Sequence, residues 1–300
     1  MKEQNKMTLA KQRSRDTNRV ATIFLIPVCV LLIIYMLYPI VDTFITSLFQ
    51  WNGISADKLF IGIENWKELI VDKDFWEAFL HNCVLMVFSI IIQLPISIAL
   101  ATFLNFLGKR GGIFKVIWFI PMLMSSVAVG FLFQYILATN GGVISMISNL
   151  FGGGNIDLLG SNKFALFAVL GVVSWQSIPF YMVYFLASYS GISTDVFEAA
   201  KIDGATRGQY FWRIALPLLK PSISKAVILS LVGSLKYFDL IFVMTQGGPG
   251  NSTELMATYM YKNSFVNFNM GYGSTVAGGM FILITIISLV TMKATSGKED

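Results

Sequence analysis

Long apolar runs alternate with short polar segments along this chain. Each run holds about 20 or more mostly apolar residues, the length that a helix needs to cross the hydrocarbon core of a bilayer. The pattern predicts six membrane-spanning helices, at Val20–Val41, Phe79–Phe106, Val116–Leu137, Phe164–Tyr189, Ala226–Met244 and Tyr272–Met292. The predicted fold class is therefore all-α, a polytopic membrane protein with six transmembrane helices.

The second, third and fifth runs contain residues that disturb a regular helix. The fifth is the least regular, because it includes Lys236 and Asp239. The second contains Pro95 and the third Pro121. Membrane helices tolerate proline where neighbouring groups satisfy the freed backbone carbonyls. We therefore keep all three runs as predicted spans.

The first run follows a basic stretch, a feature that signal peptides share. Residues 1–19 carry six Lys and Arg. No small-residue cleavage site follows the run, and the run is longer than the apolar region of a signal peptide. We interpret it as an uncleaved span.

The composition agrees with a membrane protein and excludes several soluble classes. Of the 300 residues 55% are hydrophobic and 13% are charged, whereas an average soluble domain has about 25% charged residues. Cys29 and Cys83 lie in apolar runs, so no disulfide framework or cysteine zinc site is expected. The single histidine, His81, leaves no basis for a histidine-rich metal site or a serine-type triad. The net charge of +5 is spread over short loops and forms no nucleic-acid-binding face.

Lys and Arg are unevenly divided between the two sets of loops. Six precede the first run, three lie between the second and third, five between the fourth and fifth, and two follow the sixth. The opposite loops carry five in total. Because cytoplasmic loops are enriched in Lys and Arg, both termini are predicted to be cytoplasmic. We expect a basic cytoplasmic segment at 1–19, a transmembrane domain at 20–292 and a cytoplasmic tail at 293–300.

The predicted outer loops are rich in glycine. Gly141-Gly142, Gly152–Gly154 and Gly247–Gly250 are typical of turns. A phosphate-binding loop needs Gly, four residues, Gly-Lys and then Ser or Thr at the start of a helix, and no stretch of the chain has this pattern. The chain is predicted to bind no ATP and no other cofactor of its own.

The segment at about 193–219, between the fourth and fifth spans, predicts a helix, a turn and a second helix. Glu198-Ala-Ala-Lys favours a helix that begins after Thr194, and Gly204 permits a left-handed turn. Pro217 and Pro221 are expected to end the second helix, whose apolar stripe is Tyr210, Phe211, Ile214 and Leu216. One interpretation is an amphipathic helix on the membrane surface. The other is a short helix, with small Ala199 and Ala200 on one side, that enters a groove of a partner.

The spacing within this segment resembles a known signature. Glu198-Ala199-Ala200, three residues, Gly204, nine residues, Ile214, one residue and Leu216-Pro217 match every fixed position of the EAA signature in membrane subunits of bacterial ABC importers. In that family the loop forms coupling helices that dock into a cleft of the ATPase subunit. The resemblance implies an ATPase-coupling role for Glu198, Ala199, Ala200, Asp203, Gly204, Ile214, Leu216 and Pro217.

Other stretches resemble the carbohydrate-uptake branch of these importers, in particular the maltose- and glycerol-3-phosphate-type first permease subunit. They are Phe60–Trp66, Phe238–Thr245 leading into Gly247–Gly250, and Gly271–Gly273. The resemblance covers residues of about 20 to 292. The large maltose subunit has extra N-terminal spans and a sizeable outer domain, whereas the outer loop here covers only about 42–78. Its contacts with the binding protein therefore do not transfer.

The resemblance implies a set of partners and a mechanism. They are a second homologous permease subunit, two ATPases that hold ATP and Mg, an extracellular solute-binding protein, and a sugar substrate. The protein would lie in the lipid of the bacterial cytoplasmic membrane, and no nucleic-acid partner is expected. The two permeases would enclose one path and open it alternately to each side as the ATPases close on ATP.

Several polar and aromatic residues within the spans are candidates for that path. Lys236 and Asp239 lie three residues apart, so on one continuous helix they would share a face and could pair. They either line the path or form an ion pair between the two permease subunits. Trp175, Gln176, Tyr181 and Tyr184 could offer stacking faces and hydrogen bonds to a sugar. Trp175 is also compatible with simple helix packing, and His81 with a polar position at the outer edge of the second span.

Three classes of function compete on this evidence. The first is half of an ATP-driven permease for a sugar or oligosaccharide, with glycerol-3-phosphate or another non-sugar solute as alternatives. The second is an autonomous channel or secondary carrier, which broken midplane helices and inverted repeats would favour; no clear repeat is present. The third is an intramembrane enzyme, for which Gly-x-Ser-x-Gly, His-Glu-x-x-His and a membrane aspartate pair are lacking. The signature loop favours the first class, a transporter subunit and not an enzyme.

Overall fold

The computed structural model describes residue 22 and residues 24–296. The predicted basic segment 1–19 and residues 297–300 of the predicted tail lie outside the described residues. The α-helices, in chain order, are α2 (Tyr38–Thr46), α3 (Glu64–Val71), α4 (Lys73–Phe88), α5 (Leu94–Leu107), α6 (Gly112–Leu123), α7 (Ser126–Ile136), α8 (Val143–Leu150), α9 (Ala165–Tyr189), α10 (Thr194–Ile202), α11 (Arg207–Tyr210), α12 (Leu216–Leu218), α13 (Lys220–Leu235), α14 (Asp239–Met244), α15 (Met256–Tyr261) and α16 (Met270–Ser296).

Within this part of the chain, five helices are long and apolar enough to cross a membrane: Phe24–Thr46, Lys73–Leu107, Ala165–Tyr189, Lys220–Met244 and Met270–Thr295. The pair α6 and α7 brings the number to six if it is counted as one broken span. The all-α, multi-pass fold is thereby confirmed. The strands of the described residues are β1 (Phe49–Gln50) and β2 (Leu59–Phe60). They form a two-stranded antiparallel sheet in which Phe49 pairs with Phe60.

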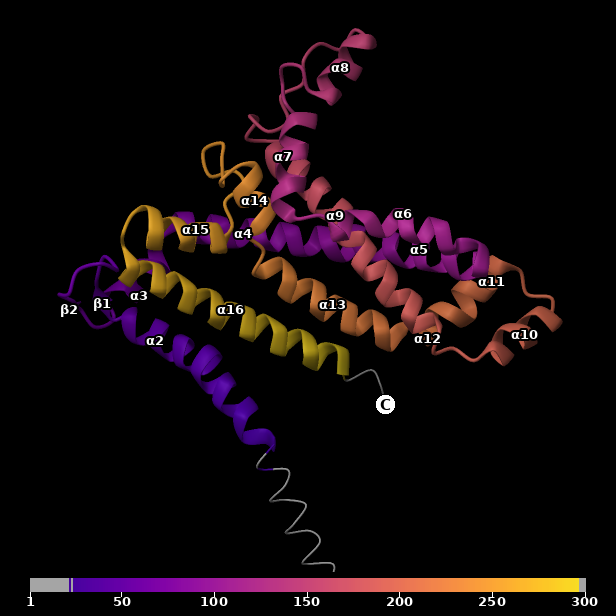
Figure 1. Ribbon diagram of the computed structural model, residues 1–300, viewed down its shortest axis with the longest axis horizontal. Helices are drawn as coiled ribbons and strands as arrows, with labels where there is room; N and C mark the ends of the chain where they lie inside the picture. Colours follow the sequence, from indigo (N-terminus) through magenta and orange to yellow (C-terminus); the bar gives the residue numbers. More distant parts are fainter. Residues whose placement is uncertain (1–21, 23, 297–300) are drawn as a thin grey trace, which may run out of the picture.

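The helices form an elongated bundle whose two ends differ. Helix α5 packs against α9, α4 against α13, α7 against α14, and α2 against α16. The β1–β2 hairpin and α3 lie at one end of the long axis, whereas α10 and α11 lie at the opposite end (Figure 1). Helix α8 stands away from the bundle beyond α7 (Figure 1). The coupling segment and the first predicted outer loop are thus far apart.

The second predicted span is one long helical element with a π-helical turn at its middle. Ser89–Gln93 forms this turn between α4 and α5. Its polar side chains are buried between three spans, where Ser89 Oγ lies 2.6 Å from Ser230 Oγ and Gln93 Nε2 donates to Ser174 Oγ at 3.0 Å. Paired hydroxyl and amide groups avoid the cost of unsatisfied polar atoms in an apolar bundle. The polar network therefore joins α4–α5, α9 and α13.

The third predicted span is broken. Helices α6 and α7 meet at an angle of 94°, and Pro121 lies inside the last turn of α6. Proline supplies no N–H to the helix and favours such a break. The carbonyl of Met124, at the bend, accepts a hydrogen bond of 3.1 Å from Gln176 Nε2 of α9. This amide satisfies a freed backbone group, as a break at membrane depth requires.

The fifth predicted span is broken as well. Helix α13 ends at Leu235 and α14 begins at Asp239. In a continuous helix the carbonyls of Ser234 and Leu235 would accept from the amides of residues 238 and 239. Here they accept from the buried side-chain amide of Asn82 on α4, at 2.8 and 3.3 Å. Asn82 thus compensates for the interruption.

Candidate functional site

The predicted coupling segment forms a helix, a turn and a second helix, as expected. Ser193 caps α10, its Oγ accepting from the amide of Asp195 at 3.2 Å. Gly204 has φ +77°, a left-handed conformation that favours glycine. Thr206 and Gln209 then cap α11 reciprocally: Gln209 N donates to Thr206 Oγ1 and Thr206 N to Gln209 Oε1.

The second helix ends between Pro217 and Pro221, as predicted: the helical stretch from α11 to α12 runs without a break from Arg207 to Leu218, and Leu219 is a turn. Pro221 lies in the first turn of the next helix, α13. The amide N–H that proline lacks has no helical partner at such a position, so proline starts a helix there without loss. A π-helical turn at Phe211–Ala215 precedes α12. The coupling segment consequently runs almost directly into the fifth span.

The signature residues divide into two groups by burial. Glu198, Ala199, Asp203 and Gly204 are exposed at the end of the bundle (Figure 1). By contrast, Ala200 is buried and Ile214 and Leu216 pack against the same core cluster as Ala200. Pro217 is exposed on the bundle side of the turn. The interpretation that Ala199 and Ala200 face a partner together is therefore wrong for Ala200, which faces the core. The exposed face that carries Ala199, held by an inward apolar face, is suited to docking in a partner's groove.

An aromatic cluster that the sequence analysis missed anchors α10 to the spans. The rings of Phe197 and Tyr210 meet edge to face with centroids 5.1 Å apart, and Phe106, at the end of α5, lies 6.1 Å from Tyr210. The Arg207 guanidinium lies 5.6 Å above the Phe106 ring. Burial raises the pKa of the Tyr210 hydroxyl. Phe197 directly precedes the signature residue Glu198. This position beside the signature is the signal in the sequence that could have identified Phe197.

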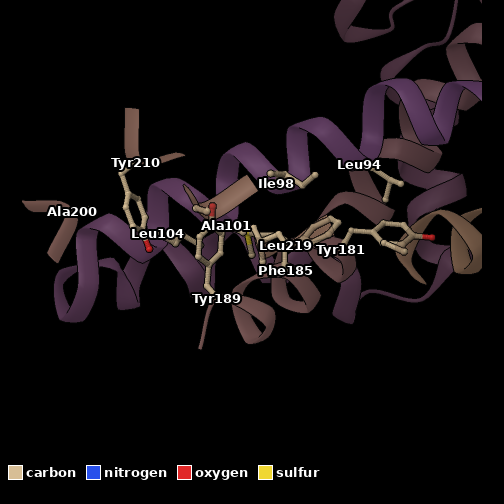
Figure 2. Packing of buried hydrophobic residues seen from close by; sticks show 13 residues of the cluster. Leu94, Ile98, Ala101, Leu104, Tyr181, Phe185, Tyr189, Ala200, Tyr210 and Leu219 are labelled. Atoms are coloured by element: carbon tan, nitrogen blue, oxygen red, sulfur yellow. The ribbon is translucent and has the colours of Figure 1, made fainter. Parts of the chain in front are cut away.

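Below this cluster the core continues between α5 and α9. Thr102 Oγ1 and the Tyr189 hydroxyl are 2.7 Å apart. Figure 2 shows Tyr210 and Tyr189 beside Leu104 and Ala101 of α5, with Ala200 at the outer edge of the cluster. Direct packing therefore connects α10 to α5 and α9.

The break between α13 and α14 carries the two charged residues proposed for the path. Lys236 and Asp239 are both exposed. The prediction that one helix carries them is wrong, because residues 236–238 interrupt the span. Ion pairs of the described residues join Lys67 to Glu64 and Lys262 to Glu254, and neither involves Lys236 or Asp239. The i to i+3 pair is thus absent from this part of the chain.

The four path candidates of α9 have different environments. Trp175 is 36% exposed and contacts Phe133 edge to face, with centroids 5.2 Å apart. Gln176 is used at the bend after α6, as described above. Tyr184 is half-buried and donates to the Ser222 carbonyl at 3.1 Å. Tyr181 is only 7% exposed within the chain, which contradicts the prediction that it lines a path. Packing against α5 and the neighbouring α13 covers its ring.

A second aromatic cluster beside the break was not predicted. Phe238 and Phe242 stack with centroids 4.8 Å apart and planes 18° apart. Tyr261 of α15 meets Phe242 at 4.9 Å, and the exposed Phe265 lies 5.3 Å from Tyr261. The i to i+4 spacing of Phe238 and Phe242 was the available signal. Partly exposed aromatic faces and a carboxylate, here Asp239, are groups that bind sugars by stacking and hydrogen bonds.

Residues 70–296 match the family described as binding-protein-dependent transport system inner membrane component. The chain is 32% identical over 280 residues to the multiple sugar-binding transport system permease protein MsmF of Streptococcus mutans serotype c, covering 92% of this chain and 95% of that protein. Among solved structures, a bacterial ABC transporter involved in the import of the acidic polysaccharide alginate has a chain with TM-score 0.82 and 22% identity, covering 97% and 99% of the two chains. The alginate transporter in complex with an alginate pentasaccharide-bound periplasmic protein gives 0.80 and 21%, over 93% and 94%.

Proposed function

This chain belongs to the family of binding-protein-dependent transport system inner membrane components, and on that premise we propose that it forms half of the translocation path of an ATP-driven importer for a sugar or oligosaccharide. The observation that carries the proposal is the α10–α11 segment. Its exposed residues Glu198, Ala199, Asp203 and Gly204 stand at one end of the bundle, and its inner face is packed on α5 and α9. This chain is a permease subunit, and the ATP would be hydrolysed by partner subunits.

The partners follow from what a permease half lacks. We propose that a second homologous permease completes the path, that two ATPases holding ATP and Mg dock on the two coupling segments, and that an extracellular solute-binding protein delivers the substrate. The similar alginate transporter was solved with its periplasmic protein. ATP-driven closure shifts the permease only if ATPase contacts differ between its states. The aromatic anchor at Phe197 is a route by which such a difference reaches the spans.

A carbohydrate is the substrate class that the chemistry beside the break favours. The Phe238–Phe242 stack and the exposed Asp239 offer apolar faces with a hydrogen-bond acceptor, and the relative MsmF is named for multiple sugars. Exposed Lys236 would instead favour an anion such as glycerol-3-phosphate. We propose Trp175, Lys236 and Asp239 as path-lining or intersubunit residues, because all three remain exposed on the isolated subunit.

The membrane is proposed to be the bacterial cytoplasmic membrane, with both termini and the coupling segment on the cytoplasmic side. The Lys and Arg bias supports this orientation. The bend between α6 and α7 and the interruption between α13 and α14 are a feature that the sequence analysis associated with secondary carriers. Membership of the transport family places them within an ABC permease instead.

Uptake by the complete importer in proteoliposomes tests this function. The assay compares a panel of radiolabelled mono- and oligosaccharides with glycerol-3-phosphate, in the presence of ATP and the solute-binding protein. We expect ATP-dependent accumulation of at least one carbohydrate. Accumulation of glycerol-3-phosphate alone would refute the sugar assignment, and uptake that persists without any ATPase subunit would refute the ABC mechanism.

A further inference from the structure

The loop between α14 and α15 encloses a buried carboxylate. Glu254 is 2% exposed, and its Oε2 pairs with Nζ of Lys262, the first residue of the π-helical turn Lys262–Val266. Its Oε1 has no hydrogen-bond partner among the described residues. Because a buried charge is costly unless it is paired, this carboxylate depends on Lys262.

The loop is shaped to hold that carboxylate. Gly247 has φ +85°, and a Cβ there would overlap Glu254 Oε2, so the approach requires glycine at this position. Thr253 closes the loop on itself: its amide donates to the Gly247 carbonyl at 3.1 Å and its Oγ1 to the Gly248 carbonyl at 2.8 Å. The hydroxyls of Thr245 and Thr253 are 2.7 Å apart. The segment 245–254 is thereby one compact unit built around Glu254.

Two consecutive residues of α4 tie this unit to the break in the fifth span. His81 Nδ1 lies 2.9 Å from the backbone carbonyl of Glu254. Asn82 Oδ1 accepts from the amide of Met256 at 2.9 Å, while its Nδ2 donates to the last carbonyls of α13. Helix α14 therefore lies between two anchored points, the end of α13 and the loop around Glu254. Its first residue is Asp239.

We propose that the Glu254–Lys262 pair is a latch that positions α14, and with it Asp239, at the break in the fifth span. The proposal rests on the proposed function, because it makes the latch part of the path's geometry. Glu254 is too buried to line the path and acts through α14, so it is a positioning residue. Loss of the pair releases the loop and lets α14 move relative to α13 and α7.

The test uses the purified importer complex with Cys29 and Cys83 replaced by serine and a single reporter, Asp239→Cys. The rate of its alkylation by a maleimide reports the position of α14. We expect Lys262→Met to change this rate about five-fold or more, because local opening governs the exposure of a neighbouring group. Lys262→Arg keeps the positive charge, so its alkylation rate at residue 239 should be close to that of the complex with the native Lys262.

Controls separate a local effect from general loss of stability. Lys67→Met removes the partner of Glu64 in an exposed i to i+3 pair and should leave the rate at residue 239 unchanged. A second reporter is Phe151→Cys, at the end of α8, where the native Phe151 is 88% exposed. Its alkylation rate should not respond to Lys262→Met.

A single change that strands Glu254 would risk preventing assembly, so the double variant Glu254→Gln/Lys262→Met is measured as well. It leaves no unpaired buried charge and is expected to assemble with an altered rate at residue 239. If the assembled double variant has an unaltered alkylation rate at residue 239, the proposal that the Glu254–Lys262 pair positions α14 is refuted. The assay needs no transported solute, so an importer that takes up no sugar yet shows the rate change would refute the substrate class and not the latch.

Discussion

Phe197 of the coupling helix packs edge to face against Tyr210, with ring centroids 5.1 Å apart. Both rings also approach Phe106 at the end of α5, at 6.5 and 6.1 Å. The contact joins the exposed part of the signature to a membrane-spanning helix. Aromatic pairs of this kind contribute about 0.5–1.5 kcal/mol beyond the area they bury, so loss of the Phe197 ring should weaken the connection between α10 and α5.

Phe197→Ala should therefore uncouple ATP hydrolysis from transport. We expect the complex to assemble, ATP hydrolysis to persist, and the amount of solute transported per ATP to fall several-fold, as expected for loss of about 1 kcal/mol of contact energy. Both rates are measured in the same proteoliposomes. Phe114→Ala is the matched control, because Phe114 forms an edge-to-face pair with Phe103 outside the coupling segment. Equal effects of the two substitutions would contradict the role of Phe197.

Gly204→Asp should disrupt docking of the ATPase without affecting membrane insertion. Gly204 has φ +77°, a left-handed conformation that favours glycine, and the carboxylate adds charge to the exposed turn. Co-purification with the ATPase is the measurement. Gly208→Asp is the control, since Gly208 lies in α11 without a positive φ and has open space around it. Normal co-purification of Gly204→Asp would remove the coupling assignment.

Helix α8 and the coupling segment are predicted to lie on opposite sides of the membrane, which is tested with cysteines at highly exposed positions. Phe151 is 88% and Ile202 is 85% exposed. With Cys29 and Cys83 replaced, Phe151→Cys should react with an impermeant maleimide in spheroplasts, whereas Ile202→Cys should react only after the membrane is opened. Labelling of residue 202 in sealed spheroplasts would invert the topology derived from the Lys and Arg bias.

Lys236→Met and Asp239→Asn should change thermal stability independently. The two side chains are exposed and do not pair, and substitutions of exposed residues usually alter the free energy of unfolding by about 0.5 kcal/mol or less. Melting temperatures of the single and double variants in detergent give the comparison. Additive small shifts are expected. A double variant more stable than either single variant would show that the residues pair in the assembled importer.

Alkaline pH should lower the thermal stability of the protein through Tyr259. Burial and a 2.5 Å hydrogen bond to Asp72 Oδ2 raise the pKa of its hydroxyl. A raised folded-state pKa stabilises the fold below the unfolded pKa of about 10, and this contribution is lost as the pH rises from there toward the folded pKa. Melting temperature should fall above pH of about 10, less steeply in Tyr259→Phe. Tyr135→Phe is the control, because Tyr135 is exposed; the same slope in both variants would contradict the assignment.

The sequence alone determined the class of this protein. Apolar runs of spanning length are sufficient for an all-α membrane fold, because a backbone in hydrocarbon must satisfy its hydrogen bonds internally. The spacing from Glu198 to Pro217 was sufficient for the ABC permease family, since the match needs no information about distant contacts. The turn at Gly204 was also predictable from its local conformation.

Only the tertiary structure decided where the spans break and which charged residues pair. Lys236 lies in the interruption after α13 and Asp239 begins α14, and Asn82, more than 150 positions earlier in the chain, donates to the carbonyls at the end of α13. Gln176 has the same role at the bend after α6. Glu254 is buried because Gly247 leaves room for its carboxylate and Lys262 pairs with it. Periodicity describes hydrogen bonds between residues four apart, whereas these interruptions are stabilised by side chains from other helices, which no local pattern records.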